Sequence, residues 1–352
     1  MDQPLVSIVL TTYNSERIVR KVLDSILSQD FPLNKVEFII IDDGSKDNTV
    51  SIIKSFIEVN AHKFYDVRLI VHDKNYGVSR ARNDGIRLAR GNYILILDHD
   101  VILLKDTLNR LLEYLESSHI KISAVIPLHK DICSNFLRKW EYRIRKNRVT
   151  RGNAITSCAL IKRDLISEAG FYDETLGPPF TIYEDIEYGA RVLAKGYEIH
   201  IVGFIEVLHD ACEESKGNIT TLQYKYDLYA FMKKLITSLK SLSQSRYRYA
   251  LKKYIRSLPL REKLRWIIYS GLILLTIPSL MLSLTIGSYL PLLMWAFLTI
   301  LTYMDVLKYY WSVSVPHISL AYSAVAFAWR LLRSIMLIIP GPNTIQDIKS
   351  KE

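Results

Sequence analysis

Short apolar runs alternate with helix-like patterns through the first hundred residues, and this alternation constrains the fold more than any other feature. The runs typical of buried strands are at 5–10, 36–41, 67–72 and 93–97. The segments with apolar side chains at helical spacing are at 15–28, 48–57 and 79–89. Such alternation predicts an α/β fold, with a mostly parallel, Rossmann-like sheet and helices on its faces.

Polar residues directly follow three of these predicted strands. The three clusters are at 11–14 (TTYN), 42–45 (DDGS) and 98–100 (DHD). One acidic turn alone would be an ordinary helix cap. Parallel sheets, however, bind ligands beyond the carboxyl ends of their strands. Two carboxylates two residues apart, such as Asp98 and Asp100, can hold a Mg²⁺ or Mn²⁺ that neutralises a nucleoside diphosphate.

The ordered set of motifs resembles the family-2 inverting glycosyltransferases of the GT-A fold. The resemblance spans about residues 5–210, and its motifs lie at 6–14, 42–45, 75–77, 81–83, 97–100, 170–174 and 183–185. It implies an enzyme that transfers a sugar (a hexosyltransferase) from a UDP- or GDP-sugar donor and uses a divalent cation.

The resemblance also implies roles for individual residues. It implies donor contacts for Thr11, Tyr13, Asp43 and Asp98, cation binding by Asp98 and Asp100, and a general base at Asp185 beside Glu184. His209 matches a histidine that contacts the cation or the diphosphate, although an ordinary core or surface histidine is an equal interpretation. Asn83 is a candidate donor contact, with a solvated helix face as its alternative.

Asp185 is also a candidate base on chemical grounds. Transfer to a hydroxyl with inversion needs a carboxylate opposite the leaving group to accept the proton. Glu184 and Asp185 open a predicted helix at 186–194, where acidic residues are common simply because they stabilise helix ends. Their place in the ordered set of motifs favours catalysis.

The acceptor side is less defined. No Gln-x-x-Arg-Trp motif follows Asp185, which favours addition of one sugar per encounter rather than processive synthesis. A general base implies a hydroxyl acceptor, such as the sugar of a lipid-linked saccharide. Two other functions stay open: a polyprenyl-phosphate (dolichyl-phosphate) glycosyltransferase and a non-catalytic membrane scaffold. Residues 138–151 include seven Lys or Arg side chains. Contact with lipid headgroups or with an acceptor pyrophosphate is one interpretation of these side chains, and an ordinary solvated helix face is the other. Arg151 and Asn153 are predicted on the acceptor side.

The carboxyl-terminal part contains 39 consecutive residues, 266–304, without a charged side chain. At about 20 residues per span, this length predicts two transmembrane helices within 266–307, although a buried helical hairpin is the alternative. Residues 308–352 are expected to form an interfacial amphipathic helix and a tail, because Arg330 and Arg333 disfavour crossing; a crossing helix stays open.

Eleven Lys or Arg residues lie between Met232 and Arg265, against one acid. Because this run precedes the apolar segment, it predicts a juxtamembrane segment at 231–265 on the cytoplasmic side rather than nucleic-acid binding. The start of the chain does not resemble a signal peptide. The predicted organisation is therefore a cytoplasmic catalytic domain at 1–230 on a multi-pass membrane anchor, with three unpaired cysteines.

Overall fold

The computed structural model describes residues 3–117, 121–132, 142–143, 145–176, 184–210, 255–258, 260–287 and 289–311. The chain divides into two compact units, Met1–Lys234 and Leu235–Glu352. Cys158 is a free, buried thiol, whereas Cys133 and Cys212 lie outside the described residues. Residues 312–352 of the predicted interfacial helix and tail, and residues 231–254 of the predicted juxtamembrane segment, also lie outside them.

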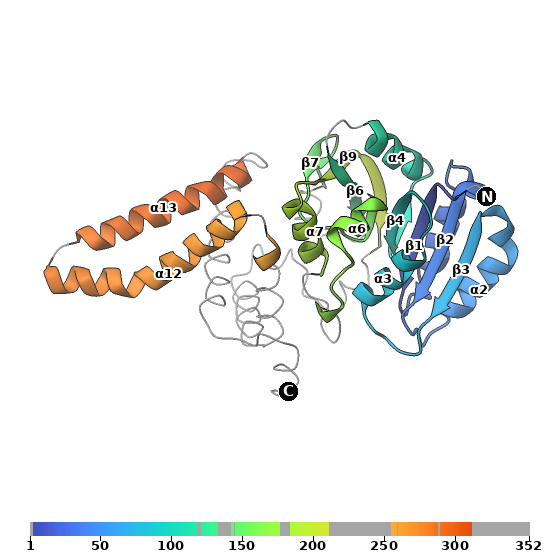
Figure 1. Cartoon of the computed structure of the whole chain (residues 1–352), viewed down its shortest axis with the longest axis horizontal. Coiled ribbons are helices and arrows are strands. Elements are labelled where there is room, and N and C mark those ends of the chain that lie inside the picture. The colour runs from blue at the N-terminus through green and yellow to red at the C-terminus, as the bar shows by residue number, and fades with distance from the viewer. Residues whose placement is uncertain are drawn as a thin grey trace. The chain divides into compact units, whose positions relative to one another are not determined.

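The first unit is built on one nine-stranded sheet in the order β3-β2-β1-β4-β8-β6-β9-β5, with β7 beside β9 (Figure 1). The strands are β1 Val6–Thr12, β2 Val36–Asp42, β3 Asp66–Val71, β4 Tyr93–Asp98, β5 Val101–Leu103, β6 Ile122–Asp131, β7 Val149–Arg151, β8 Cys158–Lys162 and β9 Glu198–His209. The first four are mutually parallel, as predicted. β8, β5 and β7 pair antiparallel with their neighbours, so the sheet is mixed.

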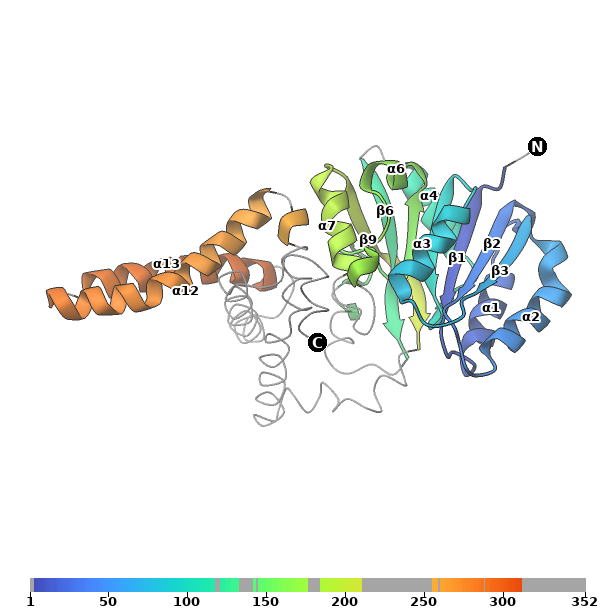
Figure 2. The ribbon, with the colours of Figure 1, turned by 60° about the horizontal axis from the view of Figure 1, so that its bottom comes forward.

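Helices cover both faces of this sheet (Figure 2). They are α1 Val19–Leu27, α2 Thr49–Asn60, α3 Val78–Leu88, α4 Thr107–Ser117, α6 Asp164–Ala169 and α7 Glu184–Ala194, with short 3-10 turns at Leu33–Lys35, Ala61–Lys63 and Glu174–Leu176. Because successive side chains of a strand point to opposite faces, Ile8 and Leu10 of β1 pack with α1, α2 and α4, whereas Val9 packs with α3, α6 and α7.

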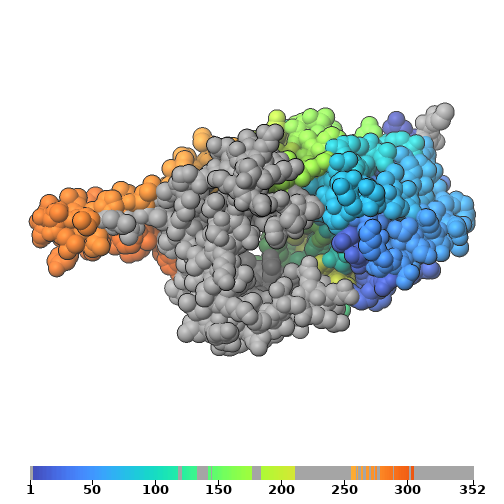
Figure 3. Space-filling model, turned by 90° about the horizontal axis from the view of Figure 1, so that it is seen from below, coloured from blue at the N-terminus to red at the C-terminus, as the bar shows by residue number. Residues whose placement is uncertain are grey.

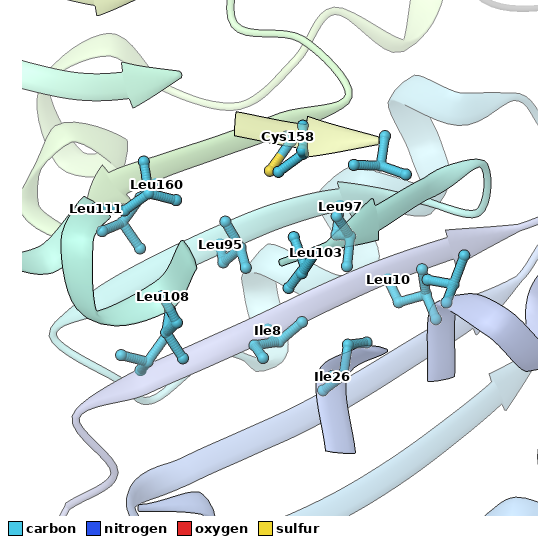
Figure 4. Packing of buried hydrophobic residues seen from close by; sticks show 14 of the residues in the cluster. Ile8, Leu10, Ile26, Leu95, Leu97, Leu103, Leu108, Leu111, Cys158 and Leu160 are labelled. Carbon is cyan, nitrogen blue, oxygen red and sulfur yellow. The ribbon is translucent and has the colours of Figure 1, made fainter. Parts of the chain in front are cut away.

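The face that carries α1 and α4 is a continuous aliphatic layer. Figure 4 shows Ile8 and Leu95 between Leu108 of α4 and Ile26 of α1. All four side chains are fully buried. In the space-filling view the residues of the first unit, from blue to green, form one packed body (Figure 3). This packing gives the loops at the strand ends a fixed base.

The strand register brings distant motifs to one edge of the sheet. Thr11 pairs with Asp98 in adjacent parallel strands, and Thr12 pairs with Asp42. β8 runs antiparallel to both β4 and β6, and β9 is parallel to β6, so β4, β6 and β9 all point the same way. His209, the last residue of β9, therefore reaches the edge where β1, β2 and β4 end.

The second unit contains the described helices α12 Leu260–Ile286 and α13 Leu290–Trp311. The helices pack together, and Trp295 Nε1 donates a hydrogen bond of 2.9 Å to the Leu272 carbonyl. Gly287 has a φ of 63°, which suits the turn between them. Within the described residues, neither of these helices nor any other combines the length and apolarity that crossing a bilayer requires. The expected pair of helices forms, but the prediction that they are transmembrane spans is not supported.

Candidate active site

Asp98, at the end of β4, is held by two neighbours. Thr11 Oγ1 donates to its Oδ1 at 3.1 Å, and Arg82 Nη2 donates to its two oxygens at 3.0 and 2.8 Å. The Arg82 side chain is only 4% exposed, and its planar guanidinium lies over the Tyr172 ring. Buried charges need partners because desolvation is costly. Asp98 and Arg82 therefore stabilise each other at the centre of this edge.

Asp43 joins the turn after β2 to the loop before α3. Its oxygens accept hydrogen bonds from the backbone N–H groups of Tyr76 at 2.9 Å and Gly77 at 2.7 Å, and Nδ1 of His72 lies 2.8 Å away. Gly44 has a φ of 77°, and a Cβ there would lie 2.5 Å from the carbonyl carbon of Lys74. Only glycine suits this left-handed turn and close approach.

Thr11 and Asp43 thus lie on two adjacent strands whose ends share one edge, as the sequence predicts. Tyr13, just beyond β1, is 40% exposed and available to a ligand at that edge. Their contacts with a donor base stay a prediction.

Asp100 and His209 lie side by side although they are 109 residues apart in the sequence. His209 Nε2 lies 3.1 Å from Asp100 Oδ2, whereas Asp100 Oδ1 is buried and has no hydrogen-bond partner among the described residues. Burial lowers the pKa of His209, but hydrogen bonds to Asp100 and Asp131 outweigh it and raise that pKa to about 10. The two side chains therefore converge at the strand-end edge of the sheet.

The unpaired, buried Asp100 oxygen fits a divalent cation that it would bind together with His209. Within the described ranges, no group of three or more His, Cys, Asp or Glu side chains is arranged to hold a metal ion. Asp98 is engaged by Arg82 instead. The cation-binding role of Asp98, Asp100 and His209 stays a prediction.

Glu184 and Asp185 form the first turn of α7. Asp185 is tied to the core because its carbonyl accepts from the Ile155 N–H at 3.2 Å. Farther along α7, a Cβ on Gly189 would lie 2.4 Å from the Asn153 carbonyl oxygen, so glycine lets the helix approach this segment. Arg82 Nη1 lies 3.9 Å from Glu184 Oε1, which links the acidic pair to Asp98.

The environment of these two acids favours their protonated forms. Burial raises the pKa of Asp185, despite an opposing hydrogen bond from the Ile186 N–H. Burial and the negative charge of Asp185 raise the pKa of Glu184 from 4.5 to about 7. Perturbed carboxyl groups in one place are typical of catalytic sites.

The raised pKa of Glu184 predicts a pH-dependent stability. Between pH 4.5 and about 7, Glu184 is protonated more fully in the folded chain than in the unfolded chain. Its contribution to the free energy of unfolding is therefore complete below pH 4.5 and is lost as the pH rises to about 7. Glu184→Gln keeps the size and stays neutral, so we expect a flatter stability curve in this window. Urea unfolding of both proteins across and above the window measures it; curves of equal slope would contradict the burial of an acidic Glu184.

Three predicted site residues, Asn83, Arg151 and Asn153, have surroundings that the sequence did not indicate. Asn83 is buried, and its amide donates to the Tyr172 carbonyl at 2.8 Å and to Glu174 at 2.9 Å while it accepts from the Tyr172 N–H. Asn83 thus ties α3 to the 171–176 segment, and its contact with a donor stays a prediction. The sequence could not reveal this because Tyr172 lies far along the chain.

Arg151 lies at the other end of the sheet from the strand-end edge. It pairs with His200 near the start of β9, its side chain is 79% exposed, and it binds Glu198 at 2.7 Å. This pairing near the start of β9 separates Arg151 from His209, which is the last residue of β9. Asn153 is exposed and contributes its backbone to the packing of Gly189. The acceptor-side role of Arg151 and Asn153 stays a prediction, with Arg151 placed away from the strand-end edge.

The sequence reasoning missed three residues beside the site: Arg82 as the partner of Asp98, and His129 and Asp131 beside His209. His129 and Asp131 alternate along β6 and so share one face of it. This alternation of polar residues after an apolar run was the available signal.

Comparisons with known proteins agree with this geometry. Residues 7–170 match the family model described as Glycosyl transferase family 2. This stretch, slightly less than half of the chain, is therefore similar to a family 2 glycosyltransferase domain, and its sheet has a GT-A-like fold.

Individual relatives extend the comparison. An uncharacterized glycosyltransferase of Haemophilus influenzae is 34% identical over 34% of this chain and 46% of its own length. The poly-beta-1,6-N-acetyl-D-glucosamine synthase of Staphylococcus epidermidis is 29% identical over 55% of this chain and 47% of its own. The chain thus spans about half the length of these two relatives. The names of such relatives support a nucleotide-sugar glycosyltransferase.

Solved structures share the fold. S. aureus TarS 1-349, in complex with UDP, matches with a TM-score of 0.50 and 19% identity, over 73% of this chain and 82% of TarS 1-349. The mannosyltransferase PcManGT from Pyrobaculum calidifontis, in complex with GDP-Man and Mn2+, matches with a TM-score of 0.50 and 16% identity, over 100% of this chain and 89% of its own.

Proposed function

We propose that the chain transfers a sugar from a UDP- or GDP-sugar to a hydroxyl of a lipid-linked saccharide, with inversion at the anomeric carbon. The observation that carries the proposal is the convergence, at one sheet edge, of the Asp98–Arg82 pair, the Asp100–His209 pair and the buried acids of α7. Inverting transfer needs these groups on two sides of the reacting carbon: charge compensation at the leaving diphosphate and a base at the acceptor.

The residues of the chain divide this work between donor and acceptor. Thr11, Tyr13 and Asp43 bind and orient the nucleoside end of the donor, because they line the ends of β1 and β2. Asp185 accepts the proton of the acceptor hydroxyl, and its hydrogen bond from the Ile186 N–H orients the carboxylate. Glu184, held near Arg82, shapes the acceptor side.

A divalent cation belongs to the proposal. Asp100 and His209 would hold it, because a buried Asp100 oxygen has no partner in the part of the chain that the structure describes and the two side chains already converge. When bound, Mg²⁺ or Mn²⁺ supplies positive charge that stabilises the departing nucleoside diphosphate. The Mn2+ complex of PcManGT supports cation use in this fold.

We place the reaction at the cytoplasmic face of a membrane, where a lipid-linked acceptor would be found. Large apolar side chains are exposed along both helices of the second unit, among them Ile267, Leu274, Leu284, Leu293 and Phe297. Extended exposed apolar surface is typical of lipid or protein contact. The preceding Lys and Arg residues would be drawn to anionic headgroups, at roughly 1 kcal/mol each.

A donor and acceptor panel tests the function. The protein would be incubated with UDP- and GDP-sugars, Mn²⁺ and a membrane lipid extract, and the lipids analysed by mass spectrometry. We expect a single added hexose on a lipid-linked saccharide, with an inverted anomeric configuration. Transfer to polyprenyl phosphate alone would contradict the hydroxyl acceptor, and donor hydrolysis without any lipid product would contradict the lipid acceptor.

Truncation tests the membrane contact. We expect chains ending after Lys234 or after Ser257 to be extracted without detergent while the full chain floats with liposomes, because both lose the apolar helices. The two truncations differ by the basic stretch at 235–257, so retention of only the longer one would assign membrane binding to those cations. Donor binding, measured by calorimetry, should persist in both. Flotation of both truncated chains would contradict the role of α12 and α13.

A further inference from the structure

His209 lies between two carboxylates that come from two different strands. Its Nδ1 is 2.5 Å from Asp131 Oδ1, and its Nε2 is 3.1 Å from Asp100 Oδ2. β9 runs between β6 and β5: Asp131 is the direct register partner of His209 on β6, and Val101, which follows Asp100, is its partner on β5. The sheet itself therefore fixes all three side chains.

The contact with Asp131 selects one form of the imidazole. An ionised carboxylate only accepts hydrogen bonds, so Nδ1 carries the hydrogen and donates it to Asp131. A bound cation would take the place of the hydrogen on Nε2, the atom that faces Asp100, and the ring would then offer its lone pair there. Asp131 is well placed for this task because its side chain is only 9% exposed.

A second histidine supports the ring from the side. His129 stacks on His209 with ring centroids 5.6 Å apart and an interplanar angle of 28°. Its Nε2 is buried and has no hydrogen-bond partner among the described residues. The stacked ring therefore presents its face to His209 and contributes packing rather than a hydrogen bond to it. Rotation of His209 is thus limited on one side by packing and at Nδ1 by Asp131.

We propose that Asp131 is the positioning residue of the cation site: it holds His209 so that Nε2, beside the unpaired oxygen of Asp100, is directed at the bound divalent cation. The inference rests on the proposed function, which requires that cation. Carboxylates that accept the second N–H of a ligating histidine commonly fix its orientation and raise its basicity. Asp131 does not itself touch the reacting atoms.

A competing arrangement predicts different behaviour. If His209 were a permanent imidazolium that bridges Asp131 and Asp100, both nitrogens would carry hydrogen and neither could bind a cation. Loss of Asp131 would then remove a carboxylate that favours the imidazolium, and Mn²⁺ binding would not weaken. Mn²⁺ alone, without donor or acceptor, therefore distinguishes the two arrangements.

Mn²⁺ titration of the full chain, followed by electron paramagnetic resonance, measures the affinity, and pulsed experiments on the bound ion detect coupling to a ligating nitrogen. We expect nitrogen coupling in the wild type and its loss in His209→Ala. Asp131→Ala should weaken Mn²⁺ binding by about 10–100-fold and reduce the nitrogen coupling. Asp131→Asn keeps an acceptor oxygen near Nδ1 and should lose less. Asp24→Ala, which removes an exposed acid on α1, is the matched control and should bind as the wild type.

Wild-type affinity and nitrogen coupling in both Asp131 variants would overturn the proposal, as would bound Mn²⁺ without nitrogen coupling in the wild type. If Asp131→Ala does not fold, Asp131→Asn decides by the same two readouts. Sugar transfer that depends on Mn²⁺ while nitrogen coupling is absent would refute this inference alone. Transfer that needs no divalent cation would instead refute the cation in the proposed function.

Discussion

Asp185→Asn is expected to lower kcat by about 10²–10⁴-fold, the usual contribution of a general base. Asparagine keeps the size of the side chain and can still accept from the Ile186 N–H, so the local structure at the start of α7 should persist. What the variant loses is the ability to take the acceptor proton. Donor affinity should change little, because the donor is bound at the ends of β1 and β2.

Steady-state kinetics with the lipid acceptor, together with calorimetry of donor binding, measure both quantities. Glu184→Gln is the matched control: it lies in the same turn, and its loss of rate should be smaller if that side chain only shapes the acceptor pocket. The pH–rate profile of the wild type should fall on the acid side, because protonation of Asp185, whose pKa burial raises, removes the base. A near-normal rate of Asp185→Asn with polyprenyl phosphate would show that an anionic acceptor needs no base.

Asp100→Asn is expected to lower transfer by at least about 10²–10³-fold, comparable to the loss of one strong electrostatic stabiliser in other enzymes. An amide cannot supply the negative charge that holds a hard divalent cation. Chelation of the wild type by EDTA should have the same effect, and added Mn²⁺ should restore the wild type but not the variant.

Initial rates with and without EDTA, and Mn²⁺ titration of the variant, measure this prediction. Asp24→Asn, on the exposed face of α1, removes the same charge away from the strand-end edge and should leave the rate unchanged. Full activity of the wild type in EDTA would refute a cation requirement, and full activity of Asp100→Asn alone would move the cation to other ligands.

The first half of the sheet was predictable because its information is local. Each of β1, β2 and β4 is a short apolar run, and the polar residues that follow it are adjacent in sequence. The predicted helices at 48–57 and 79–89 also correspond to α2 and α3. The second half was harder: β9 mixes polar and apolar residues over twelve positions, and its pairing with β6 and β5 spans distant parts of the chain.

The carboxyl-terminal prediction shows the limit of composition. A charge-free stretch predicted helices, and α12 and α13 form there. The absence of charged residues does not by itself make a helix long and apolar enough to cross a membrane, and none of the described helices is. Arg151 shows a similar limit, because its position in the sequence does not reveal that it pairs with the start of β9 rather than with its end.

The sequence by itself determined that the carboxylates at the ends of β2 and β4, namely Asp43, Asp98 and Asp100, gather at one sheet edge, because parallel strands with local polar clusters leave little freedom. Only the tertiary structure decided their partners. Arg82 neutralises Asp98, Asn83 is used to tie α3 to Tyr172, and Asp131 holds His209. Each of these pairs joins side chains whose proximity depends on strand order and packing. Desolvation then makes the pairing obligatory, since a buried charge or amide is costly without a partner.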